Sequence, residues 1–166
     1  MNDVTLDVGK GKFSYRVGAL IIDNGELLMV KNENMGSHFY TPGGRVQAGE
    51  SVHDAVIREL FEETKMEFKP GRLAFIHENF FMPYNRDARY YHEIAMYFIM
   101  EATSRARSML YSSFKADYGE ALFEWLPTNK LDEYILFPEF LKKELVDIKP
   151  YVRHFVTKNE ITTLVE

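Results

Sequence analysis

Three glutamates in the middle of the chain have the types and spacing best suited to chemistry. Glu59, Glu62 and Glu63 lie in a segment with helical periodicity, where residues three or four apart share one face. On a helical wheel Glu59 and Glu63 fall on the apolar stripe of that segment, and Glu62 lies at its edge. Like charges at this spacing repel, and a half-buried carboxylate must become neutral or gain a cation. A divalent ion such as Mg²⁺, which prefers oxygen ligands, meets this need.

The helix that must position these glutamates is predicted to begin near Ser51. Ser51 can act as the N-cap, and Asp54, three residues later, can complete a capping box with it. The alternative is an ordinary solvated acidic face, partly balanced by Arg58 and Lys65, because charge runs usually lie on the surface. The coincidence of the acidic residues with the apolar stripe argues against that alternative. The apolar stripe consists of Val52, Ala55, Val56 and Leu60.

A glycine turn precedes the predicted helix at a fixed distance. Gly44 is followed after five residues by Glu50, and after seven more by the run from Arg58 to Glu63, RELFEE. This pattern resembles the Nudix box, G-x5-E-x7-R-E-U-x-E-E-x-G-U, where U is an aliphatic residue. Every fixed position matches except the late glycine, which is Lys65 here. In the family that glycine lies just past the helix, so a lysine predicts a differently shaped helix exit.

The resemblance implies both a fold and a reaction. The fold is of the α/β class, a Nudix-like α/β/α sandwich with a mixed β-sheet and a catalytic loop–helix–loop. The reaction is hydrolysis of the pyrophosphate bond in a nucleoside diphosphate linked to another moiety, with Mg²⁺ as cofactor and Mn²⁺ as a substitute. Nucleoside triphosphates, ADP-ribose and dinucleoside polyphosphates all contain this reacting unit, so the motif leaves the substrate open. The alternative is a catalytically weak Nudix-like module that senses or binds a nucleotide metabolite.

The same resemblance assigns roles within the box. Glu62 and Glu63 are expected metal ligands, and Glu59 is expected to be either a ligand or the general base. Glu63 is also a candidate catalytic residue. The carbonyl of Gly43 is a further candidate ligand, because the missing side chain lets the backbone approach an ion.

Two other residues of the box are expected to support the metal site. By resemblance, Glu50 and Arg58 connect the glycine loop to the helix, and Glu50 orients the metal-binding carboxylates. The alternative partner for Arg58 is Asp54, four residues earlier on the same helix.

A further acidic ligand or base often precedes the strand that contains the tryptophan in this family. Glu120 is the candidate catalytic residue here, because it falls in a segment that reads as a loop. Asp117 and Glu124 are rivals, and the alternative is that all three are exposed loop acids.

Substrate contacts are predicted from a loop and the start of a strand. Arg86 and Arg89 are candidate phosphate ligands, and Tyr84 is a candidate to stack on a base. Exposed arginines without such a role are the alternative. His92 and Glu93 interrupt an apolar strand, so we expect one of them to face the cleft or a buried partner.

Composition limits the classes of protein to which the chain can belong. Its 166 residues fit one domain, 1–166, in which 1–12 is either a flexible arm or an edge strand. Residues 151–166 are expected to form a C-terminal extension, either a last strand or a contact in a homodimer. The net charge of -5 argues against binding long nucleic acid over the whole surface. It does not argue against a small nucleotide-type substrate, because a local pocket and a bound metal can reverse the sign of the field.

The sequence has no cysteine, which excludes disulfides, thiolate zinc sites and a cysteine nucleophile. An isomerase on the same fold, of the isopentenyl diphosphate type, uses a cysteine and is therefore disfavoured. No signal peptide or membrane-length apolar run is present, so we expect a cytoplasmic protein with no membrane partner.

The remaining pattern predicts a mixed sheet between helical layers. A helix is predicted over 131–148, divided at Pro138, and 103–119 is predicted to be an excursion with a short helix. Asn24-Gly25 is a hairpin turn signal. The predicted strands cover 13–22, 27–31, 72–82, 89–102 and 123–127.

Overall fold

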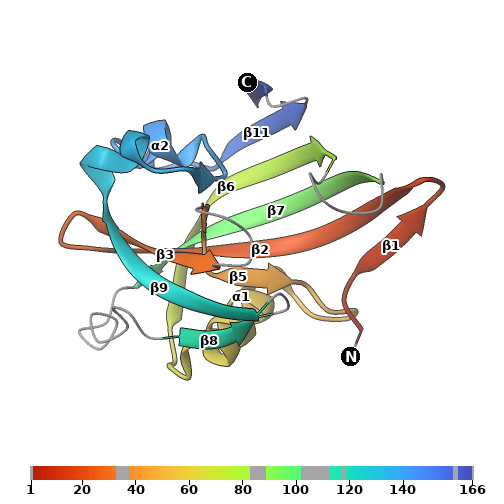
Figure 1. Cartoon of the computed structure of the whole chain (residues 1–166), viewed down its shortest axis with the longest axis horizontal. Helices are drawn as coiled ribbons and strands as arrows, with labels where there is room; N and C mark the ends of the chain where they lie inside the picture. The colour runs from red at the N-terminus through yellow and green to blue at the C-terminus, as the bar shows by residue number, and fades with distance from the viewer. Residues whose placement is uncertain are drawn as a thin grey trace.

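A mixed β-sheet forms the centre of the protein (Figure 1). The computed structural model describes residues 2–32, 38–82, 89–101, 113–116, 119–158 and 161–165. The elements are β1 (Thr5–Val8), β2 (Gly11–Asp23), β3 (Glu26–Asn32), β4 (Phe39–Tyr40), β5 (Gly43–Arg45), α1 (Val52–Thr64), β6 (Lys69–Phe81), β7 (Tyr90–Glu101), β8 (Ser113–Ala116), β9 (Gly119–Pro127), the 3₁₀ helix η3 (Thr128–Glu133), β10 (Leu136–Phe137), α2 (Leu141–Glu144), β11 (Arg153–Lys158) and β12 (Ile161–Val165).

The long strand β2 organises the sheet. It pairs in parallel with β7 from Gly11 opposite Tyr90 to Ile21 opposite Met100. Beyond β7 come β6, β11 and β12, and on the other side β3 connects to β4 and β9. The predicted hairpin between β2 and β3 is confirmed, because Asn24-Gly25 takes positive φ angles of 50° and 77°. Parallel and antiparallel neighbours together give the mixed sheet that the sequence predicted.

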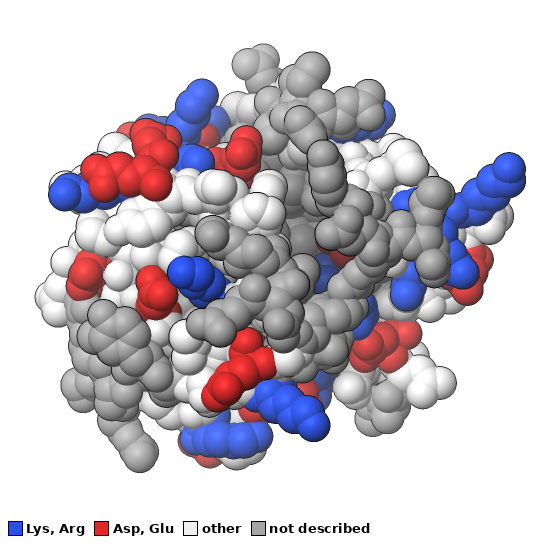
Figure 2. Space-filling model, in the orientation of Figure 1, with Lys and Arg blue, Asp and Glu red and all other residues white. Residues whose placement is uncertain are grey.

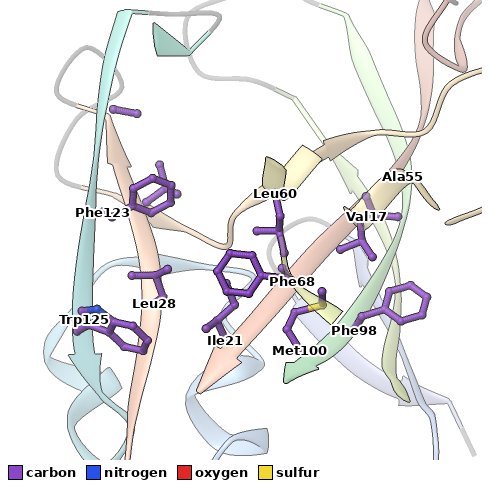
Figure 3. Close-up of a cluster of buried hydrophobic side chains, with 14 of the residues drawn as sticks. Val17, Ile21, Leu28, Ala55, Leu60, Phe68, Phe98, Met100, Phe123 and Trp125 are labelled. Carbon is purple, nitrogen blue, oxygen red and sulfur yellow. The ribbon is translucent and has the colours of Figure 1, made fainter. Parts of the chain in front are cut away.

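Alternate residues of β2 enter two separate cores, because successive side chains of a strand point to opposite faces. Val17 and Ile21 pack with Leu60 of α1 in the first core (Figure 3). Leu20 packs with Leu141 of α2 in the second. The long helix α1 and the short C-terminal helices therefore cover opposite faces of the sheet.

The helix predicted over 131–148 is wrong for most of its length. The chain instead forms η3, the two-residue strand β10 and the single turn of α2. Leu131, Leu136 and Leu141 are all buried in the second core, from three different elements. Pro138 lacks the N–H that a continuous helix needs at that point. Burial of each short piece therefore outweighs the helical periodicity.

Both terminal segments join the sheet. Residues 5–8 form β1 against β2, so the edge strand, and not a flexible arm, is correct for them. The C-terminal extension supplies β11 and β12, as the last-strand alternative predicted. Within 103–119, residues 113–116 form a strand and not a helix, and most of the segment lies outside the described residues. Among the described residues no helix has the length and apolar character to cross a membrane.

The acidic helix α1 begins where the sequence predicted and ends in a way that it did not. The Asp54 N–H donates to the Ser51 Oγ at 3.1 Å, which caps the first turn. Lys65 follows the last turn in the left-handed conformation, with φ 57° and ψ 25°. The expectation of a different helix exit is therefore wrong. The Lys65 N–H donates to the Phe61 carbonyl at 2.9 Å, and its Nζ donates to the Glu62 carbonyl at 2.9 Å.

Glycine at position 65 should stabilise the protein, because a side chain costs free energy in the left-handed region. We expect Lys65→Gly to raise the free energy of unfolding by about 0.5–1 kcal/mol, after allowing for the more flexible unfolded chain. Urea denaturation at pH 7 measures this change. Lys65→Ala is the matched control, since it removes the Nζ contact but keeps the backbone cost. A glycine variant no more stable than the alanine variant would contradict the prediction.

A buried histidine makes the stability of the sheet sensitive to acid. His77 of β6 shares a 2.7 Å hydrogen bond with Thr157 of β11 and packs edge-on against Phe140. Burial lowers the pKa of His77 from 6.5 to about 4. Between these values the unfolded chain binds a proton that the folded protein does not, so stability falls as the pH falls through this window.

We therefore expect His77→Gln to flatten the loss of stability between pH 6.5 and 4. The difference from wild type across this window should reach up to about 3 kcal/mol. Urea denaturation at several pH values measures it. His53→Gln, at an exposed position on α1, is the control. Equal pH dependence in wild type and His77→Gln would show that His77 does not carry the effect.

Candidate active site

Two glycines place β5 tightly between β2 and α1. Gly43 lies opposite Gly18 of β2, and Gly44 lies opposite Val17. A Cβ at Gly43 would overlap the Val17 carbonyl, and its φ of +134° is a conformation that other residues rarely adopt. A Cβ at Gly44 would overlap the Glu59 carboxylate. The glycines therefore bring the backbone of β5 against the acidic face of the helix.

Arg58 connects that loop to the helix through all five of its N–H donors. Its Nε and Nη2 donate to the two carboxylate oxygens of Glu50 at 2.8 and 2.9 Å. Nη2 also donates to the Arg45 carbonyl at 2.9 Å. Nη1 donates to Glu59 at 2.9 Å and to Glu62 at 3.4 Å. One side chain thus fixes the loop, the strand after the glycines and two of the three glutamates.

Glu50 is held from both sides. It accepts the paired hydrogen bonds from Arg58 and a further 3.0 Å bond from the Gln47 N–H. The Arg58 hydrogen bonds lower the pKa of Glu50, which keeps this carboxylate ionised. The alternative partner, Asp54, instead accepts a 2.7 Å hydrogen bond from Ser51. The contact expected between Glu50 and Arg58 is present, and the role of Glu50 toward a metal stays a prediction.

Glu63 has the opposite environment. Burial raises its pKa to about 8, and the Gly43 N–H, which donates to its Oε2 at 3.1 Å, opposes this only in part. Burial also raises the pKa of Glu59, against the hydrogen bond from Arg58. Glu62 differs from both, because 55% of its side chain is exposed. The two glutamates on the inner side of the helix are therefore the ones that would gain most from a bound cation.

The side chains of Glu59 and Glu63 fit a hard cation such as Mg²⁺, because they offer carboxylate oxygens beside a backbone turn. Within the described ranges, no three acidic or histidine side chains converge into a complete metal centre. Mg²⁺ is commonly held by one or two carboxylates together with substrate phosphates and water, which requires no third protein ligand. The carbonyl of Gly43 stays a predicted ligand.

Sequence reasoning missed an arginine beside these glutamates. Arg16 of β2 lies close enough for its charge to lower the pKa of both Glu59 and Glu63. It pairs with Glu93 of β7 at 3.6 Å. The available signal was the polar pair His92-Glu93 in an apolar strand. Glu93 is the more buried of the two, and it is the one that contacts Arg16. Arg16 itself gave no signal, because its contacts depend on the register between β2 and β7.

His92, the other member of that polar pair, lies elsewhere. Its ring stacks on Phe80 with centroids 4.1 Å apart and meets Phe13 edge-on. Phe13 and Phe80 both belong to strands of the sheet, so His92 packs within the sheet and does not contact the glutamates of α1 through these rings.

Glu120 is not brought to the other glutamates by any described contact. It lies in β9 and not in a loop, where it is exposed and accepts a hydrogen bond from the Ser113 hydroxyl of β8. Its rival Glu124 lies further along the same strand, opposite Met29 of β3. The other rival, Asp117, lies outside the described residues. The catalytic role of Glu120 stays a prediction.

The predicted substrate ligands are not assembled by the described contacts either. Arg89 pairs with Asp7 at 2.9 Å, next to the start of β7. The first residue of β7, Tyr90, lies opposite Gly11 of β2, whereas the glycine turn lies opposite Gly18. Gly11 and Gly18 are seven residues apart on one strand, which is about 23 Å. This position does not favour Arg89 as a phosphate ligand. Tyr84 and Arg86 lie outside the described residues.

Several solved structures of low sequence identity share this fold. A MutT protein from Methanosarcina mazei Go1 has a TM-score of 0.62 and 24% identity, covering 86% of this chain and 99% of that chain. A mutator MutT protein from Bacillus halodurans has a TM-score of 0.61 and 18% identity, covering 92% and 95%. An ADP-ribose pyrophosphatase from Streptococcus suis has a TM-score of 0.53 and 14% identity, covering 87% and 98%. At these identities the likeness shows the fold alone.

A search of curated proteins finds no match. The family model of the NUDIX domain, however, matches residues 12–147, which is most of the chain. The matched region contains the glycine turn, the acidic helix and the strands that carry Arg16 and Glu93. The chain therefore belongs to the NUDIX domain family.

Proposed function

We propose that this protein hydrolyses the pyrophosphate bond of a nucleoside diphosphate joined to another group, with Mg²⁺ as cofactor. The observation that carries this proposal is the half-buried carboxylate of Glu63, which accepts one hydrogen bond from the Gly43 N–H and whose pKa desolvation raises to about 8. A perturbed carboxylate beside a second one, on a helix of this family, is typical of a catalytic site and not of a stabilising one. The structurally similar protein from Streptococcus suis, named an ADP-ribose pyrophosphatase, supports a small nucleotide-type substrate.

In this proposal Glu63 and Glu59 hold the metal from the inner side of α1, with Glu62 at the exposed edge. The bound ion would neutralise phosphate oxygens and lower the pKa of attacking water. Glu59 keeps its alternative role as general base, which its raised pKa suits. Arg58 prevents Glu59 from turning away, because it holds one of the two carboxylate oxygens at 2.9 Å. Mn²⁺ is the expected substitute ion.

The surface charge agrees with a small substrate. The net charge is -5, and acidic and basic side chains are interspersed on the face shown in Figure 2. A protein that follows a long nucleic acid needs a continuous basic track instead. A homodimer and a cytoplasmic location remain predictions from the sequence.

The reaction can be tested by incubating the protein with Mg²⁺ and a panel of nucleoside triphosphates, ADP-ribose and dinucleoside polyphosphates. We expect at least one compound to yield a nucleoside monophosphate, identified by chromatography, and ¹⁸O-water to label one product at phosphorus. Glu63→Gln should lower turnover by about 100-fold or more, since a lost metal ligand removes several kcal/mol of transition-state stabilisation.

Glu67→Gln is the matched control for that variant, because it removes the same charge from an exposed residue just past the helix. Full turnover by Glu63→Gln would contradict the site assignment. Binding of a panel compound without any product, over the whole panel and with both metals, would instead favour a nucleotide sensor.

The metal-free protein should also show the cost of burying Glu63. Its folded-state pKa of about 8 lies above the ordinary 4.5, so the stability that its proton provides is present below pH 4.5 and is lost as the pH rises through 8. Glutamine cannot lose a proton at this position. In EDTA, we therefore expect the free energy of unfolding of Glu63→Gln, relative to that of wild type, to rise by about 3 kcal/mol between pH 5 and pH 8.

Urea denaturation at pH 5 and pH 8 measures that gain, with Glu67→Gln as the control again. Saturating Mg²⁺ should reduce the difference at pH 8, because the ion stabilises wild type and not the variant. A variant that is less stable than wild type at pH 8 in EDTA would show that Glu63 is well compensated in the fold.

A further inference from the structure

Two arginines lie beside the metal-site glutamates, and they differ in how many of their donors are used. Arg58 spends all five N–H groups on its neighbours, and 22% of its side chain is exposed. The guanidinium of Arg16 makes no hydrogen bond within the described part of the chain. Its nearest acidic partner is Glu93, at an N–O distance of 3.6 Å, and 34% of its side chain is exposed. Arg58 therefore has no capacity for a ligand, whereas Arg16 keeps its donors.

The position of Arg16 follows from the strands around it. It lies opposite Arg45 of β5, and the next two residues of β2 lie opposite Gly44 and Gly43. Arg16 is thus one residue along β2 from the position opposite Gly44, which lies against the Glu59 carboxylate. The influence of its charge on both Glu59 and Glu63 agrees with this placement. A ligand held at those glutamates would come within reach of a long arginine side chain.

Glu93 holds Arg16 away from the glutamates. The side chain of Glu93 is only 16% exposed, and Glu93 lies on β7, which pairs with β2 along the edge opposite to β5. Beside it the buried ring of Tyr97 fills the space over Gly18 and limits where the arginine can turn. An unrestrained guanidinium would pair directly with Glu59 or Glu63 and compete with a metal ion for their oxygens.

We infer that Arg16 binds a phosphate oxygen of the substrate next to the metal-site glutamates, and that Glu93 is its positioning residue. This inference rests on the proposed function of the same site. A diphosphate held by a metal ion presents further anionic oxygens, and the planar fork of a guanidinium can donate two hydrogen bonds to them. Arg16 supplies such a fork, which is paired with Glu93 but makes no hydrogen bond among the described residues.

The inference is tested with the hydrolysis-resistant probe imidodiphosphate, titrated calorimetrically into the protein with Mg²⁺. We expect Arg16→Gln to raise the Kd of the probe about 10- to 100-fold, the loss expected for charged hydrogen bonds. The Kd of Arg16→Lys should lie between those of wild type and Arg16→Gln, because lysine keeps the charge but lacks the planar fork. With the compound that wild type hydrolyses, KM should rise by a similar factor while kcat changes less than about 3-fold.

Binding of Mg²⁺ alone separates a positioning role from a structural one. Arg16→Gln should bind Mg²⁺ about 2- to 5-fold more tightly, because it removes a cation beside the carboxylates. Glu93→Gln should bind it about 2- to 5-fold more weakly, because the released Arg16 moves onto the glutamates. A simple loss of packing would weaken Mg²⁺ binding in both variants.

Lys69→Gln is the matched control, since it removes one positive charge from an exposed ion pair with Glu101 on the same sheet. Circular dichroism melting of each variant checks the fold, and Arg16→Lys carries the test if Arg16→Gln does not fold. The inference is overturned if Arg16→Gln and the control bind imidodiphosphate equally, or if wild type does not bind it. The proposed function fails separately, when wild type binds the probe but hydrolyses no compound of the panel.

Discussion

The guanidinium of Arg58 is the interaction on which the geometry of the site depends. It joins the carboxylate of Glu50, the carbonyl of Arg45 and the carboxylate of Glu59, which come from the loop, the strand and the helix. All five donors are engaged, and those to Glu50 form a bidentate pair. A lysine has one point of attachment and three donors, so it could not hold three segments in one plane. The glycines matter for the same reason, because they let the strand come within reach.

Glu50 and Glu63 show how one residue type is divided between two tasks by its surroundings. Glu50 accepts three hydrogen bonds, which lower its pKa and make it a permanent brace. Glu63 accepts one from the Gly43 backbone and is otherwise desolvated, which raises its pKa to about 8. The first arrangement stabilises the fold, whereas the second costs stability until a proton or a cation arrives. Proteins retain such costs mainly where function needs them.

The parts of this protein that the sequence predicted are those set by short-range spacing. The start of α1, the Asn24-Gly25 turn and the Glu50 contact with Arg58 each involve residues within about ten positions of one another. The failures have other causes. The left-handed Lys65 shows that a favourable cap outweighs a residue preference, and the short elements within 131–148 follow a core that periodicity cannot reveal. Arg16 was missed because only the sheet register brings it to Glu93.

The charges around the site support different roles for its two arginines, with Arg58 bracing the loop and Arg16 available to the substrate. Glu50, Glu59, Glu62, Glu63 and Glu93 carry five negative charges when ionised, and Arg58 and Arg16 carry two positive charges, so five minus two leaves an excess of three. One divalent ion balances two of these charges, whereas a proton on Glu63 balances one. The ion-bound site is then still acidic when a polyanionic substrate arrives. A substrate therefore needs a cation that is not already committed, and of the two arginines only Arg16 still has donors to offer.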